Sequence, residues 1–222
     1  MFRIRASACG KIMTNSRKKG ELSKTTKSYL ELWLKEQLYG RRKEIKSKYM
    51  DKGVLMEDNA IDFAAENMGL FLLKKNEENF KNDFFSGTPD VIQKDFIIDT
   101  KCSWDFSGFP LFEKEIPNKD YYYQGQIYMD LVGLDTFKLV YCLMDTPEHL
   151  IQSEARMYCH RTGYDIEDVI EKFKKKMTFS DLDPKLRIKI FEFKKDETVI
   201  QQIKDRVIEC RNYIETLNQS IK

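Results

Sequence analysis

Apolar residues recur along this chain with two different spacings, and the alternation between them predicts an α/β protein. Spacings of three and four residues indicate helices over residues 25–38, 52–68, 117–133, 164–177 and 197–217, and Ser7 is expected to cap a short helix that ends at Ile12. Short apolar runs indicate strands at residues 70–75, 80–85, 88–93, 96–102, 136–144 and 186–194. The strands at 88–93 and 96–102 form a predicted hairpin, and the strand at 136–144 is apolar enough to be buried. We therefore expect a central mixed sheet flanked by helices.

Composition and length favour one globular domain. The 222 residues are 41% hydrophobic and 33% charged, without an internal repeat, a low-complexity segment or a linker rich in Pro, Gly or Ser. No apolar run reaches the length of a membrane span, and the first residues, MFRIRASACG, lack the apolar segment of a secretory signal. We therefore expect a cytoplasmic location and no partnership with a membrane.

The cysteines and histidines do not form a metal-binding or disulfide pattern. No CxxC pair occurs, and there are only two histidines, His149 and His160. The five cysteines are dispersed along the chain: Cys9, Cys102, Cys142, Cys159 and Cys210. Any metal ion in this protein would therefore be held by oxygen ligands.

Charge is distributed unevenly although the net charge is only +2. Residues 1–52 contain fifteen Lys and Arg and five Asp and Glu, a balance of +10, so the remaining residues carry −8. A basic quarter of this kind is typical of a surface that binds a polyanion such as DNA. On charge alone, a solvated helix face rich in lysine explains it equally well.

The stretch SGTPDVIQKDFIIDTKC, residues 86–102, places charged residues inside a predicted buried hairpin. Side chains alternate along a strand, so Asp99 and Lys101 share one face, and Asp90 precedes them across the hairpin. Two neighbouring carboxylates repel each other unless a cation lies between them, and Mg²⁺ prefers such oxygen ligands. For an isolated Asp-x-Lys motif, a salt-bridged hairpin is the simpler interpretation.

The core stretch, with TPDVI and IIDTK, and three further segments together favour the metal site over the salt-bridged hairpin. TPDVI and IIDTK resemble the core of the PD-(D/E)xK nuclease superfamily, and three other segments resemble the phage recombination exonucleases related to lambda exonuclease, also called YqaJ-like. These segments are RASACGKIM near the start, GVLMEDNAI with Glu57, and IPNKDYYYQGQIYMDLVG with Gln124. The resemblance spans about residues 3–144 and implies a restriction-endonuclease-like fold. It also implies one nuclease domain over residues 1–222, with basic N-terminal helices (1–52), the catalytic core (about 53–144) and a C-terminal strand and helices (145–222).

The resemblance implies roles for the matching residues. Asp90, Asp99 and the main-chain carbonyl of Thr100 would bind the metal, and Glu57 would complete the site directly or through water. Lys101 would orient or activate the attacking water, and Gln124 would position that water or the scissile phosphate. Residues expected to contact DNA or its 5′ phosphate are Arg5, Ser7, Thr88, Tyr128 and Trp104. The second acid is Asp99 where the family more often has Glu, and its shorter side chain is expected to shift the metal site without removing it.

The implied activity is metal-assisted hydrolysis of DNA. Two Mg²⁺ (or Mn²⁺) ions would activate the attacking water and stabilise the leaving 3′ oxygen. The enzyme would digest one strand of linear double-stranded DNA from 5′ to 3′ and leave a 3′ single strand for recombination and for an annealing partner protein. Relatives often form rings around DNA, so a homo-oligomer such as a trimer is expected, in a phage or prophage context within a bacterial host.

Three alternatives remain open or are disfavoured. A site-specific or structure-specific endonuclease shares the same core. An iron–sulfur nuclease of similar core needs clustered C-terminal cysteines, which this chain lacks. A non-catalytic module that binds DNA ends predicts the loss of an acid or the lysine, yet all of these residues are present. Residues 145–222 match no motif of the family.

Overall fold

Two β-sheets form the centre of the molecule in the part of the chain that the structure describes, residues 1–18, 20–44, 47–71 and 73–221. The structure is a computed structural model of the whole chain. The strands are β1 (Ile4–Arg5), β2 (Phe80–Lys81), β3 (Phe85–Gly87), β4 (Val91–Ile92), β5 (Ile97–Cys102), β6 (Thr136–Cys142) and β7 (Ile188–Lys194). The helices are α1 (Cys9–Ile12), α2 (Lys24–Tyr39), α3 (Lys48–Met68), α4 (Lys119–Val132), α5 (Glu148–Thr162), α6 (Ile166–Met177) and α7 (Glu197–Gln219).

The main sheet has four strands in the order β4-β5-β6-β7. Strands β4 and β5 are antiparallel, β5 and β6 are parallel, and β6 and β7 are antiparallel. The sheet is therefore mixed and flanked by helices, which confirms the predicted α/β class. The predicted hairpin is also present, because Val91 pairs with Ile98 and Ile92 with Ile97.

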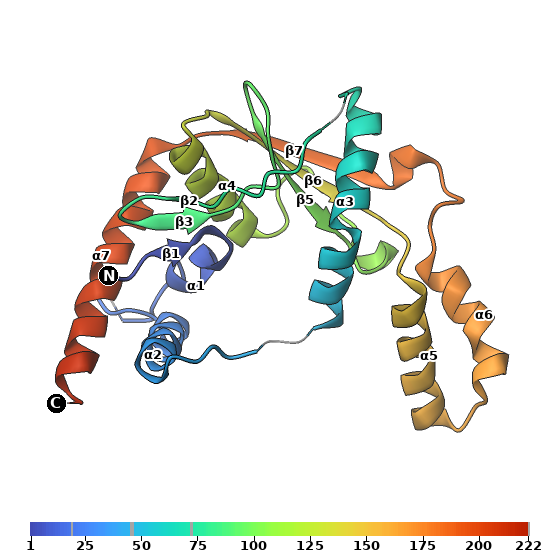
Figure 1. Cartoon of the computed structure of the whole chain (residues 1–222), viewed down its shortest axis with the longest axis horizontal. Helices are drawn as coiled ribbons and strands as arrows, with labels where there is room; N and C mark the ends of the chain where they lie inside the picture. Colours follow the sequence, from blue (N-terminus) through green and yellow to red (C-terminus); the bar gives the residue numbers. More distant parts are fainter. Residues whose placement is uncertain (19, 45–46, 72, 222) are drawn as a thin grey trace.

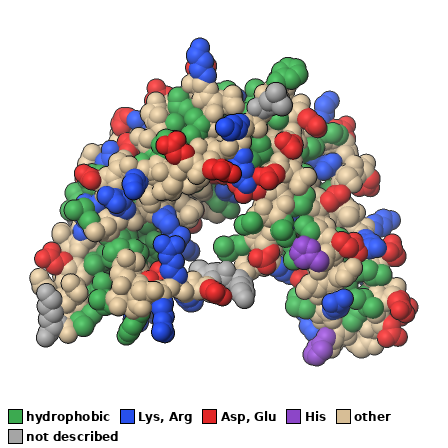
Figure 2. Space-filling view, viewed as in Figure 1, with side chains coloured by type: hydrophobic (Ala, Val, Ile, Leu, Met, Phe, Trp, Pro, Cys, Tyr) green, Lys and Arg blue, Asp and Glu red, His purple; other side chains and the backbone are tan. Residues whose placement is uncertain are grey.

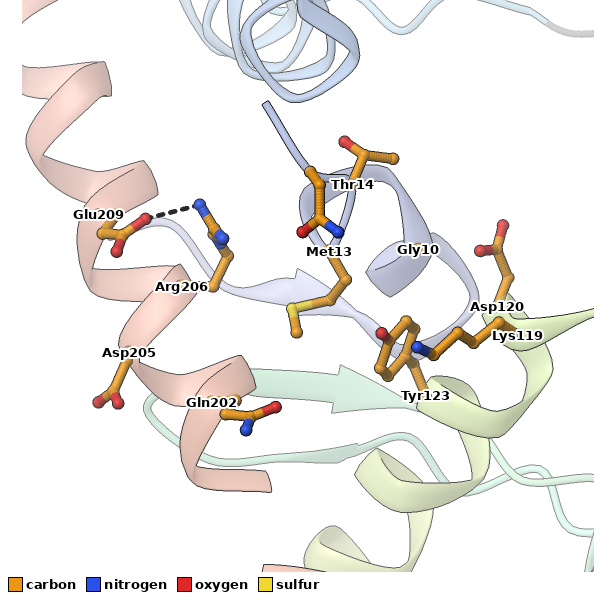
Figure 3. Close-up of a pocket in the computed structure, with 11 residues that line it drawn as sticks. Gly10, Met13, Thr14, Lys119, Asp120, Tyr123, Gln202, Asp205, Arg206 and Glu209 are labelled. Atoms are coloured by element: carbon orange, nitrogen blue, oxygen red, sulfur yellow. Dashed lines mark hydrogen bonds and ion pairs between the residues drawn. The ribbon is translucent and has the colours of Figure 1, made fainter. Parts of the chain in front are cut away.

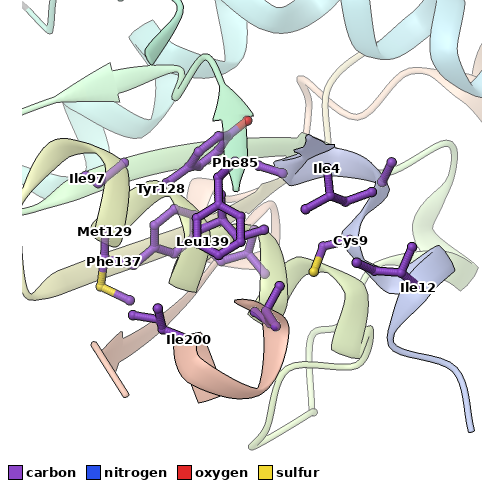
Figure 4. Packing of buried hydrophobic residues seen from close by; sticks show 14 of the residues in the cluster. Ile4, Cys9, Ile12, Phe85, Ile97, Tyr128, Met129, Phe137, Leu139 and Ile200 are labelled. Atoms are coloured by element: carbon purple, nitrogen blue, oxygen red, sulfur yellow. The ribbon is translucent and has the colours of Figure 1, made fainter. Parts of the chain in front are cut away.

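Helices cover both faces of this sheet, because β5 and β6 are apolar on both sides. On one face, Ile97, Phe137 and Leu139 pack in a large hydrophobic cluster with α4 and α7, shown in Figure 4. On the other face, Ile98 and Val140 pack in a second cluster against α3. Figure 1 shows the resulting layers, with α3 on one side of the sheet and α4 and α7 on the other.

Helix α4 lies very close to the sheet at Gly125. A Cβ atom at this position would lie 2.5 Å from the Phe193 ring and 2.8 Å from the Phe137 ring. Glycine is therefore required here by packing, because any side chain would have to displace a buried aromatic ring. The close approach brings the preceding residue, Gln124, to the end of β5.

Two elements were not predicted, and one predicted detail is wrong. Strand β1 was not predicted, and it joins β2 and β3, which lie at the strand predicted over residues 80–85, in a small second sheet of order β1-β3-β2. Helix α5, which precedes the predicted α6, was not predicted either. Ser7 does not cap a helix. It lies inside a 3₁₀ turn, Ala6–Ala8, and neither this turn nor α1 has a side-chain hydrogen bond at its cap.

Helices α5 and α6 pack against each other and project from the rest of the molecule, opposite the two chain termini (Figure 1). Figure 2 shows a hollow in this face of the molecule, with Lys and Arg side chains gathered on the wall formed by α1 and α2. None of the helices within the described residues combines the length and apolar character needed to cross a membrane.

Candidate active site

The C-terminal end of β5 opens into a cavity of about 790 Å³. Its walls come from helix α3, strand β5, the loop after β5 and the first turns of α4. Six of the predicted site residues line it, from four separate parts of the chain: Ser7, Glu57, Asp90, Thr100, Lys101 and Gln124. Asp99 lies beneath the cavity with 1% of its surface exposed.

Asp90 is held at the edge of this cavity by Thr100. Its Oδ2 atom accepts a hydrogen bond from the backbone N–H of Thr100 at 2.7 Å and another from Thr100 Oγ1 at 3.0 Å. Asp90 directly precedes β4, and Thr100 lies in the neighbouring strand β5, so the hairpin brings the two residues together. One carboxylate oxygen of Asp90 is therefore fixed, and the other is left for a further ligand.

Asp99 is buried between Lys101 and Gln124. Gln124 Nε2 donates a hydrogen bond of 3.2 Å to Asp99 Oδ1, and Asp99 Oδ2 forms an ion pair with the Lys101 ammonium group. Among the described residues, Oδ2 has no hydrogen bond of ordinary geometry beyond that ion pair. Burial, and then the negative charge of Asp90, raise the pKa of Asp99 to about 7 although Lys101 opposes this shift.

Lys101 remains a cation in this setting. Burial lowers its pKa, but the negative charges of Asp99 and Asp90 outweigh burial, so the pKa of Lys101 is raised. The ammonium group also lies 5.0 Å from the centre of the Tyr121 ring, and 22% of the side chain is exposed to the cavity. Lys101 therefore acts as a hydrogen-bond donor and a positive charge.

Glu57 approaches the cavity from the other side of the sheet. It lies on α3, which covers the face opposite to α4, and its Oε2 atom forms an ion pair of 3.2 Å with Lys75. Within the described ranges, no three Asp, Glu, His or Cys side chains come together as a ready-made metal-binding group. Asp90 and Asp99 are therefore the close pair, and Glu57 is a nearby third carboxylate.

The side chains present fit a hard divalent cation. Burial and the neighbouring Asp90 carboxylate raise the pKa of Asp99, and among the described residues its buried Oδ2 atom is partnered by the Lys101 ammonium group alone. Mg²⁺ typically binds to one or two carboxylates and completes its shell with water and phosphate oxygens. Asp90 and Asp99 satisfy this requirement without Glu57.

A smaller cavity of about 250 Å³ lies beside the first one, and Ser7 lines both. Four residues predicted to contact DNA meet here, namely Arg5, Ser7, Thr88 and Tyr128. The hydroxyl group of Tyr128 accepts a hydrogen bond of 3.0 Å from Gln124 Nε2, which joins this small cavity to Asp99. The N-terminal strand β1 positions Arg5, and this strand was not predicted.

The small cavity also contains residues that the sequence did not single out. Asn79 donates a hydrogen bond of 3.1 Å to Thr88 Oγ1, and Ser86 also lines the cavity. Gly87 is required for this arrangement, because a Cβ atom there would lie 2.5 Å from the Tyr128 ring. No local pattern around Asn79 indicates this role, since it lies in a polar segment between weak strands.

Trp104 does not line either cavity. Its ring packs against Tyr49 in a T-shaped arrangement, with centroids 5.3 Å apart, and the ammonium groups of Lys48 and Lys52 lie over it. The structure therefore gives Trp104 a packing role, and its contact with DNA stays a prediction.

Another cavity, of about 530 Å³, lies between α1, α4 and α7 (Figure 3). Its charged residues have both signs, and Arg206 is already paired with Glu209 at 2.8 Å. None of the predicted site residues lines this cavity. The cavity at the end of β5 is therefore the better candidate for the active site.

Comparison with known proteins agrees with the fold. No family model matches the chain, and no curated protein matches it. A crystal structure of a phage related exonuclease from Haemophilus somnus 129PT is 29% identical in sequence, covers 100% of this chain and 97% of its own, and superposes with a TM-score of 0.83. The protein resembles the lambda exonuclease-like branch of the PD-(D/E)xK nucleases. This resemblance was predicted from the sequence and is confirmed.

An alkaline exonuclease from Laribacter hongkongensis, LHK-Exo, has the same fold. Its structure covers 99% of this chain and 93% of its own, with 16% identity and a TM-score of 0.67. A second structure of LHK-Exo, in complex with dAMP, is 17% identical, with the same coverage and a TM-score of 0.65. At this level of identity, the likeness describes the fold alone. It extends over residues 145–222, where the sequence matched no motif.

Proposed function

We propose that this protein is a metal-dependent deoxyribonuclease that digests one strand of linear duplex DNA from its 5′ end. The observation that carries the proposal is the meeting of Asp90, Asp99 and Lys101 at the end of β5, beside a cavity open to solvent. Burial of acids and a lysine costs free energy of folding, and clusters of this kind in a cavity are typical of functional sites. Two acids that can hold a metal ion, next to a lysine, suit the hydrolysis of a phosphodiester bond.

Asp90 and Asp99 would hold the metal, with Glu57 and the Thr100 carbonyl as further ligands. Mg²⁺ or Mn²⁺, in one or two sites, would supply positive charge that activates water and stabilises a leaving oxygen. Lys101 would donate hydrogen bonds to the attacking water and to the negative charge that develops on the phosphate. It would not act as a base, because its raised pKa keeps it protonated.

Gln124 would orient the reacting groups from the side of α4. Its Nε2 atom holds Asp99 Oδ1 and the hydroxyl group of Tyr128, and its side chain is 5% exposed. A side chain with both donors engaged keeps one orientation, so it can fix Asp99 relative to a bound phosphate. The role proposed for Gln124 is therefore positioning.

The small cavity supports an action at 5′ ends. Arg5, Ser7 and Thr88 supply a positive charge and hydroxyl groups, which suit a terminal phosphate, and Ser7 connects this cavity to the main one. A phosphate bound there would set the first phosphodiester bond of the strand over Asp90 and Lys101. Digestion from 5′ to 3′ would then leave a 3′ single strand for an annealing partner.

The basic N-terminal quarter supports binding of duplex DNA. Residues 1–52 carry a balance of +10, and Lys and Arg side chains gather on the α1 and α2 wall of the hollow seen in Figure 2. The likeness to a phage related exonuclease supports a role in recombination of phage or prophage DNA. Assembly into a ring-shaped homo-oligomer belongs to the same proposal and rests on the family resemblance.

The deciding experiment compares three substrates with Mg²⁺ and with EDTA. The substrates are linear duplexes labelled at the 5′ end, linear duplexes labelled at the 3′ end, and a covalently closed circle. Mg²⁺-dependent release of mononucleotides from the 5′ terminus, with an intact circle, is the expected result. Nicking of the circle would indicate an endonuclease. Binding to ends without cleavage would indicate a non-catalytic module.

A further inference from the structure

One cation near the site has no role in the proposal so far. Lys75 forms ion pairs with two neighbouring acids of α3, at 3.2 Å from Glu57 Oε2 and at 2.8 Å from Asp58 Oδ1. Glu57 lines the main cavity, whereas Asp58 is not among the residues that line it. Lys75 thus contacts a proposed metal ligand directly, although Lys75 itself does not line the cavity.

The backbone around Lys75 is fixed to the segment that carries Asp90. Lys75 forms an isolated antiparallel bridge with Val91, and the N–H of Asn76 donates a hydrogen bond of 2.7 Å to the carbonyl oxygen of Asp90. Asn76 Nδ2 also donates to the carbonyl oxygen of Pro89 at 3.0 Å. Lys75 therefore connects the Asp90 segment to the helix of Glu57, and its position does not depend on its own side chain.

This connection accounts for the separation of Glu57 from the close pair of Asp90 and Asp99. Asp99 reaches the cavity from the α4 face of the sheet, and Glu57 comes from the α3 face with its charge paired to Lys75. Three acids without such a partner would repel one another. The ammonium group of Lys75 supplies a positive charge next to Glu57 that is part of the protein, unlike the charge of a bound metal ion.

We propose that Lys75 is a resident counter-ion that holds Glu57 aside, so that Glu57 binds a divalent cation only after it releases the lysine. This inference rests on the proposed function, because it assigns a role toward the same metal site. Lys75 is a positioning residue, since it acts through Glu57 and touches neither substrate nor metal.

The ion pair is exposed enough to exchange easily. The side chains of Lys75 and Glu57 are 38% and 30% exposed, and pairs of this kind contribute little, about two- to fivefold in an equilibrium constant. Asp58 keeps the ammonium group paired after Glu57 leaves, so the exchange does not strand a charge. Replacement of Lys75 by a neutral residue should therefore tighten cation binding by a similar factor.

The test measures Mn²⁺ binding to the DNA-free protein from the electron paramagnetic resonance signal of unbound Mn²⁺. Lys75→Gln should lower the Kd for Mn²⁺ by about two- to fivefold, whereas Lys75→Arg, which keeps the charge, should resemble the wild type. Lys74→Gln is the matched control, because it removes a lysine next in sequence that is exposed and lines neither cavity. The same substitutions are then measured in a Glu57→Gln background.

The double-variant cycle separates this role from a general effect of charge. If Lys75 acts through Glu57, Lys75→Gln has no effect on Mn²⁺ binding once Glu57 is neutral. An unchanged Kd in Lys75→Gln, or an equal gain in both backgrounds, would overturn the inference while wild-type nuclease activity remains. Absence of both Mn²⁺ binding and nuclease activity in the wild type would overturn the proposed function, and this inference with it.

Discussion

Thr100 holds Asp90 through two hydrogen bonds to a single carboxylate oxygen, at 2.7 Å from its backbone N–H and at 3.0 Å from its hydroxyl group. The two residues are ten positions apart and meet because β4 and β5 form a hairpin. The hairpin thus does more than complete the sheet, since it aims one acid at the cavity. A substitution of Thr100 can remove the hydrogen bond from the hydroxyl group and keep the one from the backbone N–H.

Thr100→Val should therefore weaken catalysis while the fold persists. Loss of one hydrogen bond to a carboxylate is expected to reduce the free energy of unfolding by about 1 kcal/mol and kcat/KM by about three- to tenfold. Thr178→Val is the matched control, because it also removes one hydroxyl hydrogen bond, of 2.9 Å to the Lys174 carbonyl, and Thr178 lines neither cavity. Equal losses of activity in both variants would show that Thr100 has no specific role.

Lys101→Ala should lose turnover and retain DNA binding. The ammonium group is the cation that Asp99 and Asp90 keep protonated, so its removal takes away transition-state stabilisation worth about 10²–10³-fold in kcat. Single-turnover digestion and an electrophoretic binding assay measure the two properties separately. Lys94→Ala, in the exposed turn of the same hairpin, should leave both unchanged. Normal turnover by the Lys101→Ala variant would remove this lysine from the mechanism.

Metal binding should strengthen as the pH rises to about 7. The pKa of Asp99 is raised to about 7, so below this pH a cation must displace a proton from the site. The affinity for Mn²⁺ should fall by about tenfold for each pH unit below 7. Calorimetric titration with Mn²⁺ at several pH values measures this slope. In Asp99→Asn the slope should disappear, and in Asp62→Asn, an exposed acid of α3, it should remain.

The same shift predicts the opposite trend for stability without metal. A raised pKa means that the folded protein retains a proton on Asp99 that the unfolded chain has lost between about pH 4 and pH 7. In EDTA, the contribution of Asp99 to the free energy of unfolding therefore declines as the pH rises through this range. Denaturant unfolding of the wild type and of Asp99→Asn across this range measures the difference. A difference that grows with pH in favour of the wild type would contradict the assignment.

Gly125→Ala should destabilise the protein and disturb the site. The added Cβ atom would lie within 3 Å of the Phe193 and Phe137 rings, and overpacking of this kind costs about 1–3 kcal/mol, partly offset by the helix preference of alanine. Displacement of α4 would carry Gln124 away from Asp99, so kcat should also fall. Gly53→Ala in α3 is the comparison for stability, because its Cβ atom meets nothing within 4 Å and should raise the midpoint of thermal unfolding.

The bounds of the long periodic elements were predicted from the sequence more closely than those of the short ones. Helices α2, α3, α4, α6 and α7 and strands β5, β6 and β7 lie close to the predicted ranges, because each buries a regular set of apolar residues. Strand β1 was missed, and β2 and β3 were predicted as one strand over residues 80–85, because strands of two or three residues are too short for a period to appear. Helix α5 was missed because only Ile151 and Ala155 are buried along its fifteen residues, so it has little apolar pattern.

The candidate site divides in the same way. Asp90, Asp99 and Lys101 follow from a motif, since their spacing along a hairpin sets their faces. The contacts around the acids come from distant segments, since Gln124 donates a hydrogen bond to Asp99 and Lys75 forms an ion pair with Glu57. Pairings of this kind depend on tertiary packing, and the sequence around Lys75 gives no local signal of its role.

Under the proposed function, helix α4 also bears on the length of the fragment that would be removed at each step. Gln124 lines the larger cavity and Tyr128 the smaller one, and the four-residue spacing on α4 separates them by about 6 Å along the helix axis. Backbone geometry, not a mobile loop, therefore fixes the separation of the two subsites. In the proposed enzyme, removal of a longer piece at each step would therefore require a different spacing between these two cavities.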